Sequence, residues 1–187
     1  MFLLRSTPKV DPSKLRFEKL SRESDTTALD CTDEDGSDPF GLQVFIRDEA
    51  LTYQAEKLGV TYLVFQDSDL VGFVTVSMTC LSIADLGEDE KVKGVRVPYP
   101  ALLLGRLAVD KRLRGKGIGA SLCRFAVGLA VEVSNTIGCR YVALHTLPDR
   151  VSFYTKEPLN FVESSLERPD KKKLLYRRVV DESVSGY

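Results

Sequence analysis

The sequence predicts one α/β (α+β) domain, in which strands and helices alternate along 187 residues. Three observations support this class. Hydrophobic residues make up 43% of the chain and charged residues 28%, as in an ordinary globular domain. Short β-rich runs are separated by turn residues. Residues 118–136 form a long amphipathic pattern, in which apolar side chains recur mainly three and four positions apart.

The expected elements follow one another without an internal repeat or a linker. The first 40 residues are polar and carry one strand near residues 15–20. A helix from residue 40 to 58 should end at Gly59, and a hairpin should join residues 61–65 to 70–78. After a charged surface loop at 87–94, we expect a buried strand at 101–109, the helix at 118–136, a strand at 140–147, a short helix at 149–156 and a final strand at 173–180.

The charge balance and the hydropathy pattern limit the partners. Lys and Arg number 26 and Asp and Glu 27, which does not favour a protein that coats nucleic acid. No run approaches the roughly 18 consecutive apolar residues of a membrane span. The opening apolar run Met1–Leu4 meets Arg5 too early for a signal peptide. We therefore expect a cytoplasmic protein with no membrane partner.

The cysteines and the single histidine offer little catalytic or metal-binding chemistry. No C-x-x-C pair is present, and Cys123 and Cys139 lie in apolar surroundings that predict buried free thiols. His145 is the only histidine, so a zinc site built on several histidines is excluded. No nucleophile motif such as G-x-S-x-G accompanies it.

An acidic stretch at residues 31–36 begins like a calcium-binding EF-hand loop. Its first ligand position is Cys31 rather than Asp, and its closing position is Leu42 rather than Glu. We therefore expect a solvated turn that leads into the following helix, and no metal site.

The segment 102–120, LLLGRLAVDKRLRGKGIGA, carries the most informative pattern. A buried strand runs into a basic, glycine-rich turn that opens directly into the long helix. Glycines allow backbone N–H groups to approach a ligand, and the helix N-terminus adds unpaired N–H groups and the positive end of its dipole. Arg112, Arg114 and Lys116 add mobile positive charge. This arrangement predicts a phosphate or pyrophosphate site.

The spacing of the glycines separates the classes of phosphate site. They stand at G-x-G-x-G, which matches neither the P-loop pattern G-x-x-x-x-G-K-[ST] nor the dinucleotide fingerprint G-x-G-x-x-G. No acidic residue about twenty positions later completes a ribose site. A generic phosphate-binding α/β module stays open as an alternative.

The R-x-x-G-x-G string at residues 114–119 resembles the acetyl-CoA pyrophosphate loop of the GNAT superfamily of N-acetyltransferases. The Phe-Tyr pair at 153–154, followed by Asn160 and Phe161, is similar to the closing segment of that family, where Asn160 can adopt the left-handed turn of the usual glycine. The resemblance covers roughly residues 15–180. It implies a single GNAT-like domain over residues 1–187, with a core at about 15–180 and a mixed, mostly antiparallel sheet flanked by helices.

Residues 104–110, LGRLAVD, are similar to the GNAT branch that includes tRNA-acetylating toxins, although many members of that branch are uncharacterised acetyltransferases. The resemblance thus implies a transferase that acetylates a primary amine. Two alternatives are a toxin-type enzyme that acetylates aminoacyl-tRNA and a non-catalytic CoA-binding or interaction module. Dimers are common among these proteins, so a homodimer is one expectation. Basic residues that could contact tRNA, or equally form a solvated surface, are Lys171, Lys172, Lys173, Arg177 and Arg178.

The resemblance also implies the site. Acetyl-CoA would be the cosubstrate, with direct acetyl transfer and no metal. Backbone groups of Leu107, Ala108 and Val109 would pair with the pantetheine arm, like an added strand. Tyr154 would lie at the leaving sulfur, as an acid or as a hydrogen-bond donor, unless it merely packs beside Phe153. Arg106 is expected in a structural or substrate-edge role. The pyrophosphate would be held by backbone N–H groups of Arg114, Gly115, Lys116, Gly117, Ile118 and Gly119.

Overall fold

The computed structural model describes residue 11, residues 14–169 and residues 171–180. In this part of the chain, seven strands hydrogen-bond in the order β1-β2-β3-β4-β5-β7-β6. The β4–β5 pair is parallel, whereas β1–β2, β5–β7 and β6–β7 are antiparallel. The mixed, mostly antiparallel α/β class is therefore confirmed. The signal-peptide argument rests on residues 1–5, which lie outside the described residues.

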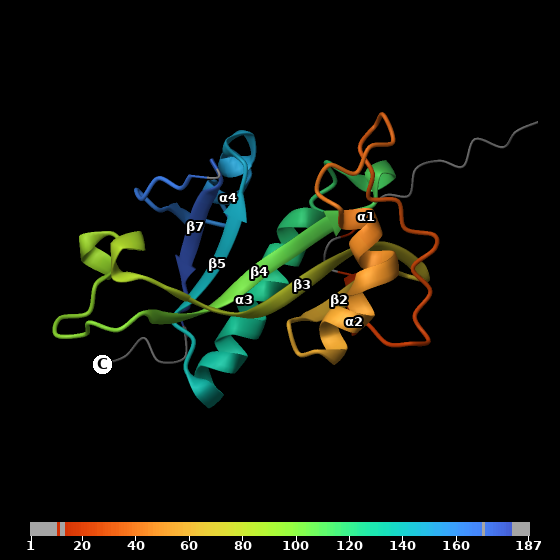
Figure 1. Ribbon diagram of the computed structural model, residues 1–187. Coiled ribbons are helices and arrows are strands. Elements are labelled where there is room, and N and C mark those ends of the chain that lie inside the picture. Colours follow the sequence, from red (N-terminus) through yellow and green to blue (C-terminus); the bar gives the residue numbers. More distant parts are fainter. Residues whose placement is uncertain (1–10, 12–13, 170, 181–187) are drawn as a thin grey trace, which may run out of the picture. The chain divides into compact units, whose positions relative to one another are not determined.

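The chain divides into two compact units (Figure 1). The first unit contains the described residues up to Thr75 together with Arg106–Leu122. The second contains Val76–Gly105 and the described residues from Cys123 onward. Strands β3 (Asp69–Leu81) and β4 (Tyr99–Val109) and helix α3 (Ile118–Ile137) each contribute residues to both units.

In the first unit, β1 (Leu15–Lys19) pairs with β2 (Val60–Gln66), and β2 continues into β3 through a tight turn. Asp67 in that turn has a φ of 55°, a left-handed conformation that asparagine and aspartate tolerate better than most residues. The hairpin expected from the sequence is therefore confirmed.

A continuous helical segment follows the acidic turn in the first unit. It consists of α1 (Leu42–Val44), the π-helical η2 (Phe45–Glu49) and α2 (Ala50–Ala55). The Asp38 carboxylate accepts hydrogen bonds from the backbone N–H groups of Leu42 at 2.8 Å, Gln43 at 3.0 Å and Val44 at 3.2 Å. These bonds satisfy donors that the helix start leaves unpaired, so the helix begins at Leu42.

The helical segment ends earlier than the sequence predicts. Lys57, with a φ of 60°, occupies the left-handed position that Gly59 was expected to serve. Its N–H donates to the Gln54 carbonyl at 3.2 Å, and the Leu58 N–H donates to the Tyr53 carbonyl at 3.0 Å. This pair of bonds is a Schellman motif, which satisfies the last carbonyls of the helix. Its left-handed residue, Lys57, lies two positions before Gly59.

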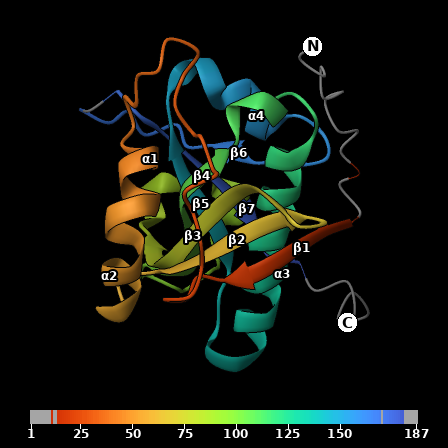
Figure 2. The same cartoon turned by 90° about the vertical axis from the view of Figure 1, so that its right-hand side faces the viewer.

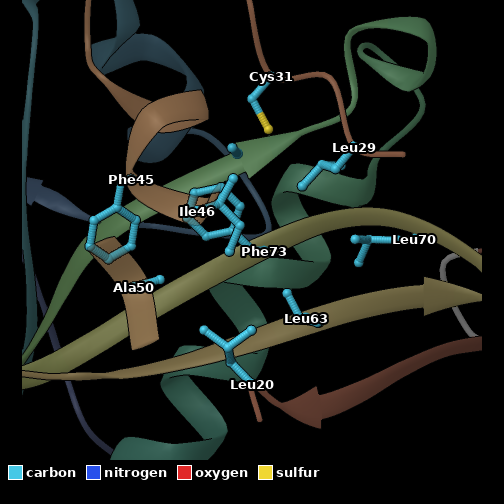
Figure 3. Packing of buried hydrophobic residues seen from close by; sticks show 10 residues of the cluster. Leu20, Leu29, Cys31, Phe45, Ile46, Ala50, Leu63, Leu70 and Phe73 are labelled. Atoms are coloured by element: carbon cyan, nitrogen blue, oxygen red, sulfur yellow. The ribbon is translucent and has the colours of Figure 1, made fainter. Parts of the chain in front are cut away.

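The core of the first unit lies between this helical segment and the strands (Figures 2 and 3). Phe45 is 1% exposed, and its ring lies 6.1 Å from that of the fully buried Phe73 on β3. The remaining buried members are Leu20, Leu29, Cys31, Ile46, Ala50, Leu63, Leu70 and Ala108. Burial of this apolar surface fixes the helical segment against one face of β2 and β3.

A buried carboxylate follows β4 in the same unit. The Asp110 side chain is 0% exposed and accepts hydrogen bonds from the Arg112 N–H at 3.0 Å and from the Arg112 guanidinium at 2.8 Å. It also accepts the Asp30 N–H at 3.2 Å. Burial acts to raise the pKa of Asp110, but the hydrogen bonds from Arg112 and Asp30 outweigh burial and hold that pKa below its usual value. Asp110 thereby joins the end of β4 to the 28–33 segment.

In the second unit, β5 (Tyr141–Thr146) lies between β4 and β7 (Lys173–Arg178). A two-residue strand, β6 (Val162–Glu163), pairs with β7 and was not expected from the sequence. Helix α3 ends before Gly138, which has a φ of 78°. The 3₁₀ turn η6 (Pro148–Arg150) leads into the short α4 (Val151–Thr155), as the sequence predicts.

Three tyrosines of the second unit, packed edge-to-face, anchor the connection between β3 and β4, which contains η3 (Ile83–Asp85) and η4 (Glu88–Glu90). The Tyr176 hydroxyl accepts the Gly87 N–H at 3.1 Å, and the Tyr99 hydroxyl accepts the Val92 N–H at 2.9 Å. The Tyr141 hydroxyl donates to the Glu90 carboxylate at 3.0 Å. The charged loop expected at 87–94 is therefore exposed but anchored.

Two further expectations concern burial. Cys123 and Cys139 are free and buried, as predicted, and Cys31 is buried as well. Among the described residues, no helix combines the length and the apolar character that crossing a bilayer requires.

Gly72 on β3 is predicted to be intolerant of a side chain. A Cβ at this position would lie 2.5 Å from the Ala108 carbonyl oxygen of β4. We expect Gly72→Ala to lower the free energy of unfolding by about 1–3 kcal/mol, measured by urea denaturation. Gly128→Ala is the matched control, because a Cβ on this exposed glycine of α3 meets no atom within 4 Å. It should raise the free energy of unfolding by about 0.5–1 kcal/mol, and equal effects of the two variants would contradict the clash.

The lowered pKa of Asp110 predicts acid sensitivity. Because the folded pKa lies below the unfolded value of about 3.9, the stabilisation is present above the unfolded pKa and is lost as the pH falls through the folded pKa. Asp110→Asn should lower the free energy of unfolding at neutral pH by about 1–3 kcal/mol and flatten its dependence on pH in the acid range. Urea denaturation across pH measures both effects. Asp149→Asn, at an exposed site, should leave the pH profile unchanged.

Candidate functional site

The glycine-rich turn leads into a helix start whose first backbone N–H groups are unpaired within the helix. Gly115 and Gly117 have φ values of 76° and 84°, a conformation that other L-residues rarely adopt. The Gly117 carbonyl accepts the first hydrogen bond of α3, from the Ser121 N–H at 3.2 Å. The N–H groups of residues 118–120 therefore have no acceptor within the helix. A Cβ on Gly115 would meet no atom within 4 Å, so the space beside this glycine is open. Unpaired N–H groups at a helix start suit an anionic ligand.

The basic side chains of this turn hold the protein backbone. The Arg114 guanidinium donates to the carbonyls of Cys31 at 2.8 Å and Thr32 at 3.0 Å, and lies 3.4 Å from the Asp33 carboxylate. Arg112 is paired with Asp110 at 2.8 Å. The expectation of mobile charge is therefore wrong for Arg112 and Arg114. Their contacts fix the turn instead, so the donors left for a ligand are the backbone N–H groups at the start of α3.

Strand β4 extends beyond its pairing with β5. The parallel register joins Ala101–Leu104 to Tyr141–Leu144, and residues 105–109 continue past it. On the β3 side, the Asp110 N–H donates to the Val71 carbonyl at 2.9 Å, and the Ala108 carbonyl faces Gly72. Because peptide groups alternate between the two edges of a strand, those of Leu107 and Val109 point to the opposite edge. That edge can accept an extended ligand as an added strand.

Tyr154 lies on α4 in the second unit. Its ring packs edge-on against Phe153 at 4.8 Å and Phe161 at 6.1 Å, and its carbonyl accepts the Phe161 N–H at 3.0 Å. Asn160 has a φ of 49°, the left-handed conformation expected at this position. Burial, and secondarily the nearby Cys123, raise the pKa of Tyr154 above its usual value. The Tyr154 hydroxyl, which has no hydrogen-bond partner among the described residues, is thus held protonated.

Arg106 of β4 stacks on two aromatic rings in the first unit. Its guanidinium carbon lies 3.8 Å from the centroid of Phe45 and 5.2 Å from that of Tyr53. These two partners, Phe45 and Tyr53, were not expected from the sequence. The available signal was a single arginine within the otherwise apolar strand at 101–109.

The second unit contains a cavity of about 410 Å³. Its wall includes the ion pair between Arg168 and the buried Asp85, whose atoms lie 2.7 Å apart. His145 and Cys80 also line it. The apolar part of the lining consists of Leu81, Pro98, Leu103, Ala143, Leu166 and Leu174.

Two further expectations about sites can be compared with the structure. Of the five basic residues considered for tRNA contact, Lys173 pairs with Glu163 at 3.1 Å, and Arg177 donates to the Leu159 carbonyl at 2.8 Å. Those two side chains therefore have structural partners. The residues that the structure describes contain no cluster of three or more His, Cys, Asp or Glu side chains arranged to hold a metal ion.

Comparisons with known proteins identify the family of this chain. The model of the acetyltransferase (GNAT) family matches residues 28–161. A tRNA-acetylating toxin of Mycobacterium tuberculosis is 31% identical over 114 residues, which cover 60% of this chain and 68% of the toxin.

Solved structures share the fold. AtaT complexed with acetyl-methionyl-tRNAfMet superposes with a TM-score of 0.73 at 23% identity, covering 88% of this chain and 94% of that one. AtaTR bound with acetyl-CoA gives a TM-score of 0.69 at 23% identity, covering 89% and 95%. The resemblance seen in the glycine-rich loop is confirmed: the chain belongs to the acetyltransferase (GNAT) family and is an acetyl-CoA-dependent N-acetyltransferase.

Proposed function

We propose that the 114–119 turn binds the pyrophosphate of acetyl-CoA and that the open edge of β4 pairs with the pantetheine arm. The observation that carries this assignment is the pair of left-handed glycines, Gly115 and Gly117, at the start of α3. Backbone N–H groups at a helix N-terminus suit a pyrophosphate. The donors would come from Arg114, Gly115, Lys116, Gly117, Ile118 and Gly119.

Along β4, the assignment to the pantetheine arm falls on Leu107 and Val109. Their peptide groups point away from β3, whereas the Ala108 carbonyl faces Gly72. Ala108 is therefore the spacer between the two residues that would pair with the arm.

A glutamate in the turn tests the pyrophosphate assignment. Gly117→Glu places a side chain and a negative charge at the proposed site, so we expect the Kd for acetyl-CoA in calorimetric titration to rise at least about tenfold. Gly94→Glu is the matched control, because Gly94 has a φ of 82°, close to the 84° of Gly117, and lies in the β3–β4 connection of the second unit. It imposes similar backbone strain and the same charge. A similar loss of affinity in both variants would contradict the assignment.

We propose further that the acceptor is the α-amine of an aminoacyl-tRNA. Two comparisons support this choice, the M. tuberculosis tRNA-acetylating toxin and AtaT complexed with acetyl-methionyl-tRNAfMet. The chemistry of amines supports it as well, because only the neutral amine attacks. Deprotonation at pH 7 costs about 4.6 kcal/mol for a lysine amine of pKa ~10.4, and about 1 kcal/mol for an α-amine of pKa ~7.7. An α-amine therefore needs no strong general base.

In the proposed reaction, the amine nitrogen attacks the thioester carbonyl carbon. The new C–N bond replaces the C–S bond, and the proton lost by the amine balances the charge on the leaving CoA thiolate. Tyr154 would donate a hydrogen bond to that sulfur. Full proton transfer from a phenol of pKa ~10 to a thiolate of pKa ~8.5 is uphill by about 2 kcal/mol. The raised pKa of Tyr154 adds to this cost, which favours the hydrogen bond.

Acetylation of aminoacyl-tRNA by the wild type and by Tyr154→Phe tests the acceptor and the tyrosine together. The wild type should form N-acetyl-aminoacyl-tRNA, and Tyr154→Phe should lower kcat at least about tenfold, since one lost donor to a developing charge has about this effect or more. Because phenylalanine keeps the ring contacts with Phe153 and Phe161, the Kd for acetyl-CoA and the Tm should not change. If Tyr154→Phe kept the kcat of the wild type, the role of Tyr154 would be to pack against Phe153 and Phe161 only.

Two other outcomes identify the alternatives. Binding of acetyl-CoA without acetylation of aminoacyl-tRNA, protein N-termini or small amines would identify a non-catalytic CoA-binding module. A toxin should halt translation when it is expressed, and Tyr154→Phe should relieve this arrest.

A further inference from the structure

Three arginines lie over the faces of aromatic rings in the described part of the chain. Arg16 lies 4.8 Å from the Phe65 centroid, Arg140 lies 5.5 Å from that of Tyr141, and Arg106 lies 3.8 Å from that of Phe45. The face of an aromatic ring attracts a guanidinium that lies over it, and the guanidinium N–H groups can still donate hydrogen bonds to other acceptors.

Arg106 differs from the other two in what its N–H groups contact. Arg16 pairs with the Glu18 carboxylate and donates to the Asp67 carbonyl at 3.4 Å. Arg140 donates to the Tyr141 hydroxyl at 3.2 Å. Arg106 has no hydrogen-bond or ion-pair acceptor among the residues that the structure describes, although its side chain is half-buried. Five donors on a permanent cation are therefore held in place without an acceptor.

The two rings beneath Arg106 pack against each other. Phe45 is 1% exposed and packs edge-on against Tyr53, with centroids 5.7 Å apart. Phe45 opens the π-helical η2, and π-helical turns inside helices occur frequently at functional sites. Arg106 is thus preorganised by the first unit before any ligand binds, which reduces the entropy lost on binding.

The neighbouring backbone indicates which ligand Arg106 meets. Under the proposed function, the pyrophosphate lies at the turn after β4 and the pantetheine arm runs back along Val109 and Leu107. The thioester end of acetyl-CoA then points toward Arg106, the residue before Leu107. An acceptor that brings its amine to the thioester would therefore bring its nearest anionic group within reach of this guanidinium.

We propose that Arg106 is a positioning residue that binds the phosphodiester nearest the aminoacyl group of the acceptor. This inference rests on the proposed function. Guanidinium groups bind both phosphates and carboxylates through paired hydrogen bonds. In an aminoacyl-tRNA, however, the carboxyl group of the amino acid is esterified and carries no charge. The nearest anion is then the phosphodiester that joins the terminal adenosine to the preceding nucleotide.

A matched pair of acceptors tests this role. One is an adenosine with an amide-linked aminoacyl group, which carries the amine but no phosphate. The other adds a cytidine through one phosphodiester. The wild type should show a kcat/KM at least about tenfold higher for the dinucleotide, and Arg106→Met should abolish this preference, mainly by raising the KM for the dinucleotide.

Control variants separate positioning from folding. Arg16→Met removes a stacked arginine of the same unit that already has protein acceptors, and it should keep the preference for the dinucleotide. Arg106→Lys keeps the positive charge without the planar fork and should retain only part of the preference. The Kd for acetyl-CoA and the Tm, measured for each variant, should match the wild type and so exclude a folding defect.

Several results would overturn the proposal. Equal kcat/KM values of the wild type for the two acceptors, or an equal loss on both in Arg106→Met, would show that Arg106 does not bind the phosphodiester. If the wild type acetylates a free amino acid and only Arg106→Met loses this activity, the anion that Arg106 binds would be a carboxylate instead. If the wild type acetylates neither nucleotide acceptor, the proposed tRNA acceptor fails too, which distinguishes that failure from a failure of Arg106 alone.

Discussion

The buried carboxylate of Asp110 is the constraint on which the first unit's site depends. It lies directly after β4 and accepts hydrogen bonds from Arg112, two residues further along the chain, and from the N–H of the distant Asp30. Loss of either partner would leave a buried charge poorly compensated. The strand end, the turn after it and the 28–33 segment therefore behave as one piece. Arg114 extends this attachment through the Cys31 and Thr32 carbonyls.

In this arrangement the side chains and the backbone of the turn have different roles. The arginines of the turn shape it, and the backbone N–H groups that follow remain available as donors. Backbone donors at a rigid turn do not need to be ordered when a ligand arrives, whereas long basic side chains do. Strand β4 likewise offers backbone groups to a ligand. One of its edges is occupied by β3, and the peptide groups of Leu107 and Val109 point to the other edge.

Sequence reasoning predicted the elements with strong local signals. The spacing of apolar residues indicated α3, and the turn at Asp67 indicated the β2–β3 hairpin, because both depend on neighbours in the sequence. It missed β6, which is too short to show a pattern, and it expected a helix stop at Gly59 where Lys57 adopts the left-handed conformation. In the site, the glycine spacing indicated the loop. The partners of Asp110, Arg114 and Arg106 come from distant segments, so no local pattern could reveal them.

The burial of three cysteines limits the reaction of the protein's own thiols with the acetyl-CoA thioester. A thioester exchanges its acyl group with any accessible thiolate, so an acetyl-CoA enzyme risks acetylating itself at cysteine. Burial raises the pKa of Cys31 and of Cys123 to about 12 and also raises that of Cys139, so these thiols stay protonated and shielded at neutral pH. Cys80 on β3 is the one exposed thiol of the four, which confines any such self-acylation to a single place.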